Sequence, residues 1–155
     1  MENIQSRPFA NESSLTAAKF LPLLARILLA VPFIPSGIGK IFDFDGTARM
    51  MASEGMPLAA VFLAGAIFIE IFGGIALLLG FKARLGATML IVFLIAATFV
   101  FHDFWTFQGA EQQAQMIQFF KNIGLLGGLI AIFAFGAGAF SLDNRSSAES
   151  AGETR

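Results

Sequence analysis

Cysteine is absent from this sequence, and its absence excludes several kinds of redox chemistry. The chain can form no disulfide, hold no cysteine-ligated metal cluster and carry no thiol or persulfide of its own. It contains a single His, and one His without a Cys or a second His beside it gives weak support to a metal or haem site. We therefore predict neither a metal site nor a haem site. A bound quinone stays compatible with this composition.

Charged residues are also scarce. They make up 14% of the sequence, against roughly 25% in ordinary soluble domains. The net charge is −1, and no basic face is available, so nucleic acid is excluded as a partner. Hydrophobic residues make up 56% of the chain, and the mean hydropathy is +0.74. The composition indicates a membrane protein, and a length of 155 residues is typical of one domain.

Four long apolar runs account for most of the chain, at about residues 20–42, 58–80, 84–102 and 119–140. The second run would extend roughly 34 Å as a helix, which is enough to cross the hydrocarbon of a bilayer. It is apolar on every face, unlike a helix of a soluble core. We therefore predict an all-α integral membrane four-helix bundle. Pro32 and Pro35 each remove a backbone donor, so we expect the first helix to be kinked at these prolines.

The distribution of Lys and Arg predicts that both termini lie in the cytoplasm. With the N-terminus inside, the cytoplasmic side carries these cations: Arg7, Lys19, Lys82, Arg84, Arg145 and Arg155. The outer connectors carry Arg49 among a majority of acidic residues, and this asymmetry agrees with the positive-inside rule. Residues 1–18 are predicted as a polar cytoplasmic tail. Residues 141–155 are small and polar, and we expect a disordered cytoplasmic tail there.

Glu70 lies just past the middle of the second apolar run, where an unpaired carboxylate costs roughly 2.5–3.5 kcal/mol. It therefore needs a basic partner. Comparison of depths along the helices favours Arg26, because an Arg side chain can cover the difference and bind a carboxylate with two hydrogen bonds. Lys40 would have to reach inward to meet Glu70. The predicted Arg26–Glu70 pair is a candidate proton relay, and fixing the helix register is the alternative role.

A second group of polar residues gathers at the predicted outer ends of the helices. Lys40 ends the first helix, His102 ends the third, and Lys121 and Asn122 open the fourth. Together with Trp105 as a stacking wall, these side chains form a candidate quinone pocket, since quinone carbonyls accept hydrogen bonds. Each residue also has a simpler interpretation: a terminal Lys can extend to the lipid headgroups, and an interfacial His can serve as a hydrogen-bonding group.

With these residues in place, the chain resembles the DoxX family of four-helix membrane proteins. The matching segments are Arg26-Ile-Leu-Leu-Ala, Ser36-Gly37-x-x-Lys40, Glu70-x-x-Gly73-Gly74, Gly80 with Arg84, His102-Asp103-Phe104-Trp105 and Phe120-Lys121-Asn122-Ile123-Gly124. The resemblance implies a multi-pass protein of the bacterial inner membrane. Some relatives look like subunits of a thiosulfate:quinone oxidoreductase, and others are similar to accessory parts of redox-stress assemblies. The wider superfamily includes relatives of an endoplasmic-reticulum cargo receptor, which is not an enzyme.

Three functions compete at this point. The first is a quinone-linked or redox-associated subunit of a membrane oxidoreductase system, with Glu70 and Arg26 as the catalytic candidates. The second is a non-enzymatic anchor or assembly subunit, favoured by the Gly124-x-x-x-Gly128 pair, which lets helices approach closely. We accordingly expect protein partners in a membrane complex, or a homo-oligomer. The third is a small permease for an anion or a lipid-like substrate, with cations that attract the substrate.

Overall fold

The computed structural model describes residues 12–145. Within that range the chain is helical and contains no strand, and four segments are long and apolar enough to cross a membrane. The elements are α1 (Glu12–Ala30), α2 (Phe33–Phe42), α3 (Phe44–Ser53), α4 (Ala59–Leu79), α5 (Ala83–Phe101), η1 (Phe104–Thr106) and α6 (Gly109–Phe135). The prediction of an all-α membrane fold with four spans is confirmed.

The first span consists of two helices, α1 and α2, which are separated at Val31 and Pro32. Pro32 has no backbone N–H to donate to the preceding turn, and it becomes the residue that precedes α2. Pro35 falls in the first turn of α2, where a missing N–H has little cost. The two prolines therefore divide the span. The bend that they were expected to introduce stays a prediction, as does the cytoplasmic location of the termini.

Helices α4 and α5 pack closely at the end where a short turn joins them. Gly80, at φ +63°, ends α4, and α5 begins at Ala83. A Cβ added at Gly73 would lie 2.7 Å from Cγ of Leu90, and one added at Gly86 would lie 2.8 Å from Cβ of Ala76. Absence of these side chains lets the two helix backbones approach, as is common in lipid.

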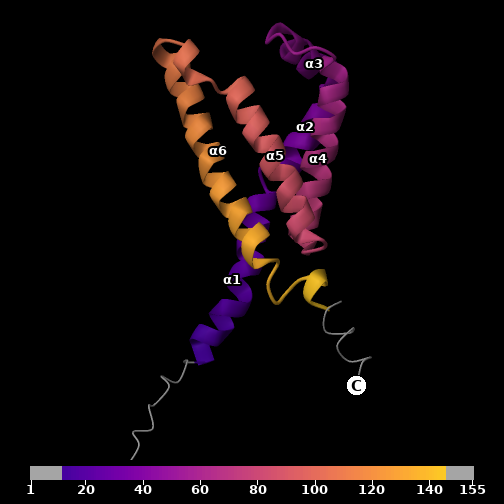
Figure 1. The fold of residues 1–155 in the computed structure, drawn as a ribbon, viewed down its shortest axis with the longest axis vertical. Coiled ribbons are helices and arrows are strands. Elements are labelled where there is room, and N and C mark those ends of the chain that lie inside the picture. Colours follow the sequence, from indigo (N-terminus) through magenta and orange to yellow (C-terminus); the bar gives the residue numbers. More distant parts are fainter. Residues whose placement is uncertain (1–11, 146–155) are drawn as a thin grey trace, which may run out of the picture.

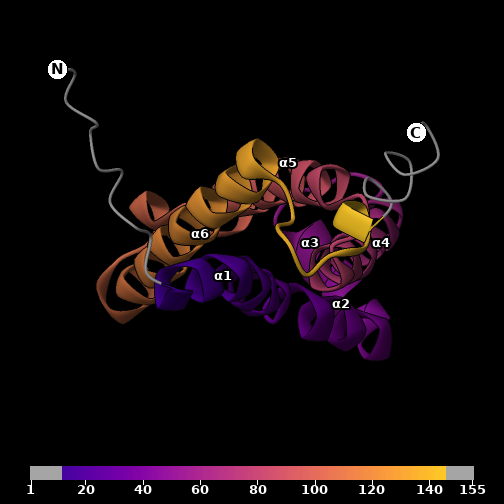
Figure 2. The ribbon, with the colours of Figure 1, turned by 90° about the horizontal axis from the view of Figure 1, so that it is seen from below.

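The other helices complete the bundle around this pair. Helix α6 packs on α5 and on α1, while α2 and α3 pack on α4. Figure 1 shows the start of α1 and the segment after α6 at one end of the molecule, with α3 and the α5–α6 connection at the other. Seen from below, α1 and α2 lie on one side and α5 and α6 on the other (Figure 2). Helix α6 begins at Gly109, before the predicted 119, because the Gln-rich segment is helical too.

The segment that follows α6 folds back under the α4–α5 turn. The amide of Asp143 donates to the carbonyl of Gly80 over 2.9 Å. Its carboxylate accepts hydrogen bonds from the amides of Lys82 (2.6 Å) and Ala83 (2.9 Å), which caps the start of α5. Residues 142–145 form a helical turn, so the prediction of a disordered tail is wrong for this part. Residues 1–11 and 146–155 of the predicted tails lie outside the described residues.

Candidate functional site

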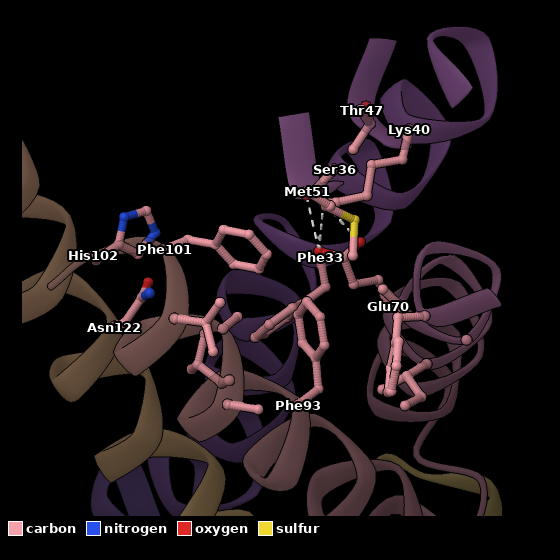
Figure 3. Close-up of a pocket in the computed structure, with 18 of the residues that line it drawn as sticks. Phe33, Ser36, Lys40, Thr47, Met51, Glu70, Phe93, Phe101, His102 and Asn122 are labelled. Carbon is pink, nitrogen blue, oxygen red and sulfur yellow. Dashed lines mark hydrogen bonds and ion pairs between the residues drawn. The ribbon is translucent and has the colours of Figure 1, made fainter. Parts of the chain in front are cut away.

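A cavity of about 640 Å³ lies in the half of the bundle nearer α3. Its walls come from α2, α3 and α4 and from α5 and α6. Polar groups are confined to two parts of the wall (Figure 3). Ser36, Lys40 and Glu70 lie on one side, and His102 and Asn122 lie on the other.

Glu70 is the centre of the first polar wall. It is 3% exposed, and its two carboxylate oxygens lie 3.0 and 2.9 Å from Nζ of Lys40. Oγ of Ser36 donates to Oε1 of Glu70 over 2.9 Å, and Nζ of Lys40 donates to Oγ of Ser36 over 2.6 Å. Ser36 and Lys40 are four residues apart on α2 and so share one face of that helix. The three side chains form a closed hydrogen-bonded triangle.

Gly37 brings α2 close enough to α4 for this triangle to form. A Cβ added there would lie 2.7 Å from Cγ1 of Ile71 and 3.3 Å from Cβ of Glu70. Gly37 sits between Ser36 and Lys40 in the sequence, so a close approach of the two helices coincides with the ion pair. A larger residue at this position would separate the charged groups.

The predicted Arg26–Glu70 ion pair is wrong. Arg26 is fully buried, but its guanidinium donates to the carbonyls of Leu77 (3.2 Å), Leu78 (3.5 Å) and Phe140. The last carbonyls of a helix have no partner within the helix, and they attract cations. Glu70 lies two turns of α4, or about 10 Å, before Leu77, and it is next to α2 instead of α1. Arg26 is absent from the cavity wall and joins α1 to the end of α4.

The second polar wall is formed by α5 and α6. Nδ1 of His102 lies 2.8 Å from Oε1 of Gln115. Nδ2 of Asn122 donates to Oγ1 of Thr98 over 3.0 Å, and this hydroxyl donates to the carbonyl of Leu94 over 2.5 Å. Sequence reasoning identified His102 and Asn122 but missed Gln115 and Thr98, which orient them. Thr98 is a hydroxyl in an otherwise apolar run, a signal that it needed a buried partner.

Two other predicted pocket residues contribute less. Lys121 lines the cavity, but its ammonium group donates to the side chain of Gln118. Trp105 is 54% exposed and is absent from the cavity wall. Its ring packs in an aromatic cluster with Phe99, Phe104 and Phe119. Trp105 is therefore no stacking wall of this cavity.

Apolar side chains separate the two polar walls. Figure 3 shows Phe33, Met51, Phe93 and Phe101 between the Glu70 side and the His102 side. The sequence did not single out these residues. A ligand that fits such a cavity has an apolar or aromatic body with hydrogen-bonding groups at its edge.

The helices and the cavity together define a class of small four-span membrane protein with a buried ion pair beside an apolar cavity. The chain belongs to the DoxX family, whose sequence model matches residues 21–103. It is 34% identical over 129 residues to inner membrane protein YphA of Escherichia coli, covering 83% of this chain and 92% of that protein. It is also 34% identical to inner membrane protein YqjF of the same organism, covering 78% and 88%.

A second family model, that of the SURF4 family, matches residues 65–148. A Surfeit locus protein 4 homolog of Schizosaccharomyces pombe is 30% identical over 69 residues, which cover 43% of this chain and 23% of that protein. No solved structure matches the chain significantly. The four apolar spans and the two bacterial relatives make this chain a multi-pass inner membrane protein.

Proposed function

We propose that this protein binds a quinone-class compound in the cavity and acts as a redox-associated subunit of a membrane oxidoreductase system. The observation that carries the proposal is the cavity itself, with hydrogen-bonding groups on two walls and an apolar interior between them. A volume of about 640 Å³ falls within the range of small-molecule sites, roughly 300–1,000 Å³.

The donors on the two walls suit a molecule with separated carbonyl oxygens. Lys40 has three N–H groups, of which two donate hydrogen bonds, one to Oγ of Ser36 and one to Oε1 of Glu70, which leaves one N–H for a ligand. On the other wall, His102 keeps its second ring nitrogen, and Asn122 keeps a second amide hydrogen. Each group is held by a neighbour, so little ordering is needed when the ligand binds.

The ion pair can also hold and move protons. A quinone supplies two-electron redox chemistry when bound, and its reduction requires two protons. Lys40 holds a proton at Nζ, and Glu70 can accept one at either carboxylate oxygen. Ionisable groups inside a membrane commonly serve proton transfer. Since the chain has no Cys and a single His, we place the electron donor on a partner protein.

An assembly subunit is the second candidate function. A Cβ added at Gly124 or at Gly127 would meet no atom within 4 Å, so part of the small-residue face of α6 is uncovered in the single chain. Such a face permits close packing of a helix from another subunit. The two candidate functions are compatible, because a redox-associated subunit also needs a partner.

An anion permease is less well supported. Arg26 donates to backbone carbonyls away from the cavity, and Lys40 is neutralised by Glu70. Neither cation is therefore available to attract an anion into the cavity, which leaves this role to Lys121, a residue of the cavity wall that donates to the neutral side chain of Gln118.

Binding of decylubiquinone to the protein in lipid nanodiscs tests the proposal. We expect Lys40→Met to weaken binding about tenfold, because a hydrogen bond from a charged donor contributes about 1.5–3 kcal/mol. Asn122→Leu, on the opposite wall, should weaken it too. Lys82→Met is the matched control, because Lys82 is exposed and lies outside the cavity wall. Absence of saturable binding to the wild-type protein would refute the proposal.

A further inference from the structure

The cavity is bounded on one side by α4 and α5, which are in contact over only part of their length. At the turn end, Gly73, Gly86 and Leu90 bring them together. Towards the α3 end both helices line the same cavity. Figure 1 shows α4 and α5 diverging in that direction, with α2, which carries Ser36 and Lys40, visible between them.

The residues that line this part of the cavity also face outward. From α4 they include Val61, Phe62 and Gly65, and from α5 they include Val92, Ala96 and Val100. Val61, Phe62 and Val92 are 66%, 55% and 64% exposed. On a membrane-spanning helix, exposed apolar side chains face the acyl chains of the lipid. One cavity therefore extends from the buried carboxylate of Glu70 to the lipid-facing surface.

We infer that the cavity opens sideways into the bilayer between α4 and α5 and takes up a neutral amphiphile from the lipid. The polar head of this ligand lies beside Lys40 and Glu70, and its apolar tail passes between the two helices past Gly65. A Cβ at Gly65 would meet no atom within 4 Å, so a tail can cross α4 at this point without displacing a side chain.

The charges of the site favour a neutral head. Lys40 and Glu70 form one ion pair and cancel each other, while Lys121, which donates to the neutral side chain of Gln118 and keeps its charge, belongs to the other wall, next to Asn122 on α6. A phosphate head brought beside Glu70 would need another cation to offset its burial. A head with carbonyl or hydroxyl groups needs only donors and acceptors, which the triangle supplies. The ligand class is thus a neutral, tailed carbonyl compound and not a phospholipid.

This inference rests on the proposed function, and photoaffinity labelling tests the two separately. The probe is a benzoquinone with a diazirine in its alkyl tail, added to the wild-type protein in nanodiscs, with decylubiquinone as competitor. We expect adducts that decylubiquinone suppresses on α4 near residues 61–65 and on α5 near residues 92–100. Native mass spectrometry of the same samples measures how much quinone or phospholipid stays bound.

Two matched variants test the passage itself. Gly65→Phe fills the space between the helices, and we expect about tenfold weaker labelling, equivalent to about 1.4 kcal/mol of binding free energy. Gly127→Phe makes the same change on α6, where a Cβ also meets no atom within 4 Å, and should label like the wild type. Ala96→Phe fills the passage from α5, so the test does not depend on the folding of one variant.

The outcomes are distinct. The side opening would be overturned if decylubiquinone suppressed adducts only outside the α4–α5 passage. It would also be overturned if labelling were unchanged in both Gly65→Phe and Ala96→Phe. Either result leaves the proposed function intact. Retention of a phospholipid that decylubiquinone displaces would overturn the neutral head. Absence of both suppressible adducts and bound quinone would overturn the proposed function and this inference with it.

Discussion

Replacing Lys40 by Met removes the cation from beside Glu70 and leaves Ser36 as the remaining donor to this carboxylate. Removal of one partner of a fully buried ion pair costs about 3–5 kcal/mol. Here the Lys40 side chain is 25% exposed, so part of its charge is already screened. The unfolded chain in a bilayer also finds other polar partners. We therefore expect Lys40→Met to lower the free energy of unfolding by about 2 kcal/mol.

The double variant Lys40→Met/Glu70→Gln gives the sharper test. It removes both charges and keeps an acceptor for Ser36, so its stability should lie within about 1 kcal/mol of the wild type. Equilibrium unfolding by SDS titration in mixed micelles measures these differences. Lys82→Met, an exposed Lys on the α4–α5 turn, is the control and should change stability by less than about 0.5 kcal/mol. A single variant as stable as this control, or a double variant no more stable than the single one, would refute the reasoning.

Two further predictions concern packing and capping. Gly37→Leu should lower the free energy of unfolding by about 1–3 kcal/mol, because the added side chain would meet Ile71 on α4. Gly39→Leu, at a position where a Cβ meets no atom within 4 Å, should have little effect. Equal effects of the two variants in the SDS titration would contradict the close approach of α2 and α4. Asp143→Ala removes the cap of α5 and should cost about 1 kcal/mol and speed proteolysis after α6, whereas Glu54→Ala, at an exposed carboxylate, should not. Cleavage at the wild-type rate would contradict the cap.

The four spans could be predicted from the sequence because a bilayer imposes a length and an apolar composition on every helix that crosses it. The same constraint does not act on residues 109–118 or 142–145. The former are polar, and they extend α6 beyond the apolar run. The latter are ordered by Asp143, whose target is the amides of a distant turn. Contacts of that kind leave no pattern in the local sequence.

The site was predictable in part. A buried acid requires a basic partner, and that rule correctly demanded one for Glu70. Depth along a straight axis then favoured Arg26 over Lys40. This choice failed because depth does not give the rotation of a helix, and because Arg26 donates to the carbonyls of Leu77 and Leu78, about two turns of α4 away from Glu70. Trp105 was misplaced as well, because its ring, on η1, packs in an aromatic cluster with Phe99 and Phe119.

The apolar lining of the cavity could not be predicted, because Phe and Met residues that pack a core and those that line a cavity look alike in a sequence. Phe33 and Phe93 come from different spans and line the same cavity. The cavity lies where α4 and α5 diverge (Figure 1), an arrangement that local sequence does not specify.

Binding of a neutral, tailed ligand in the cavity is tested by identifying the small molecule that stays with the protein when it is released gently from its native membrane. Native mass spectrometry, followed by organic extraction, gives both the mass and the stoichiometry of such a molecule. We expect one neutral, tailed carbonyl compound per chain, lost when Lys40 is replaced by Met and retained in Lys82→Met. Protein extracted with no bound small molecule would contradict the proposed ligand. So would a bound phospholipid that is retained equally in the wild type and in Lys40→Met.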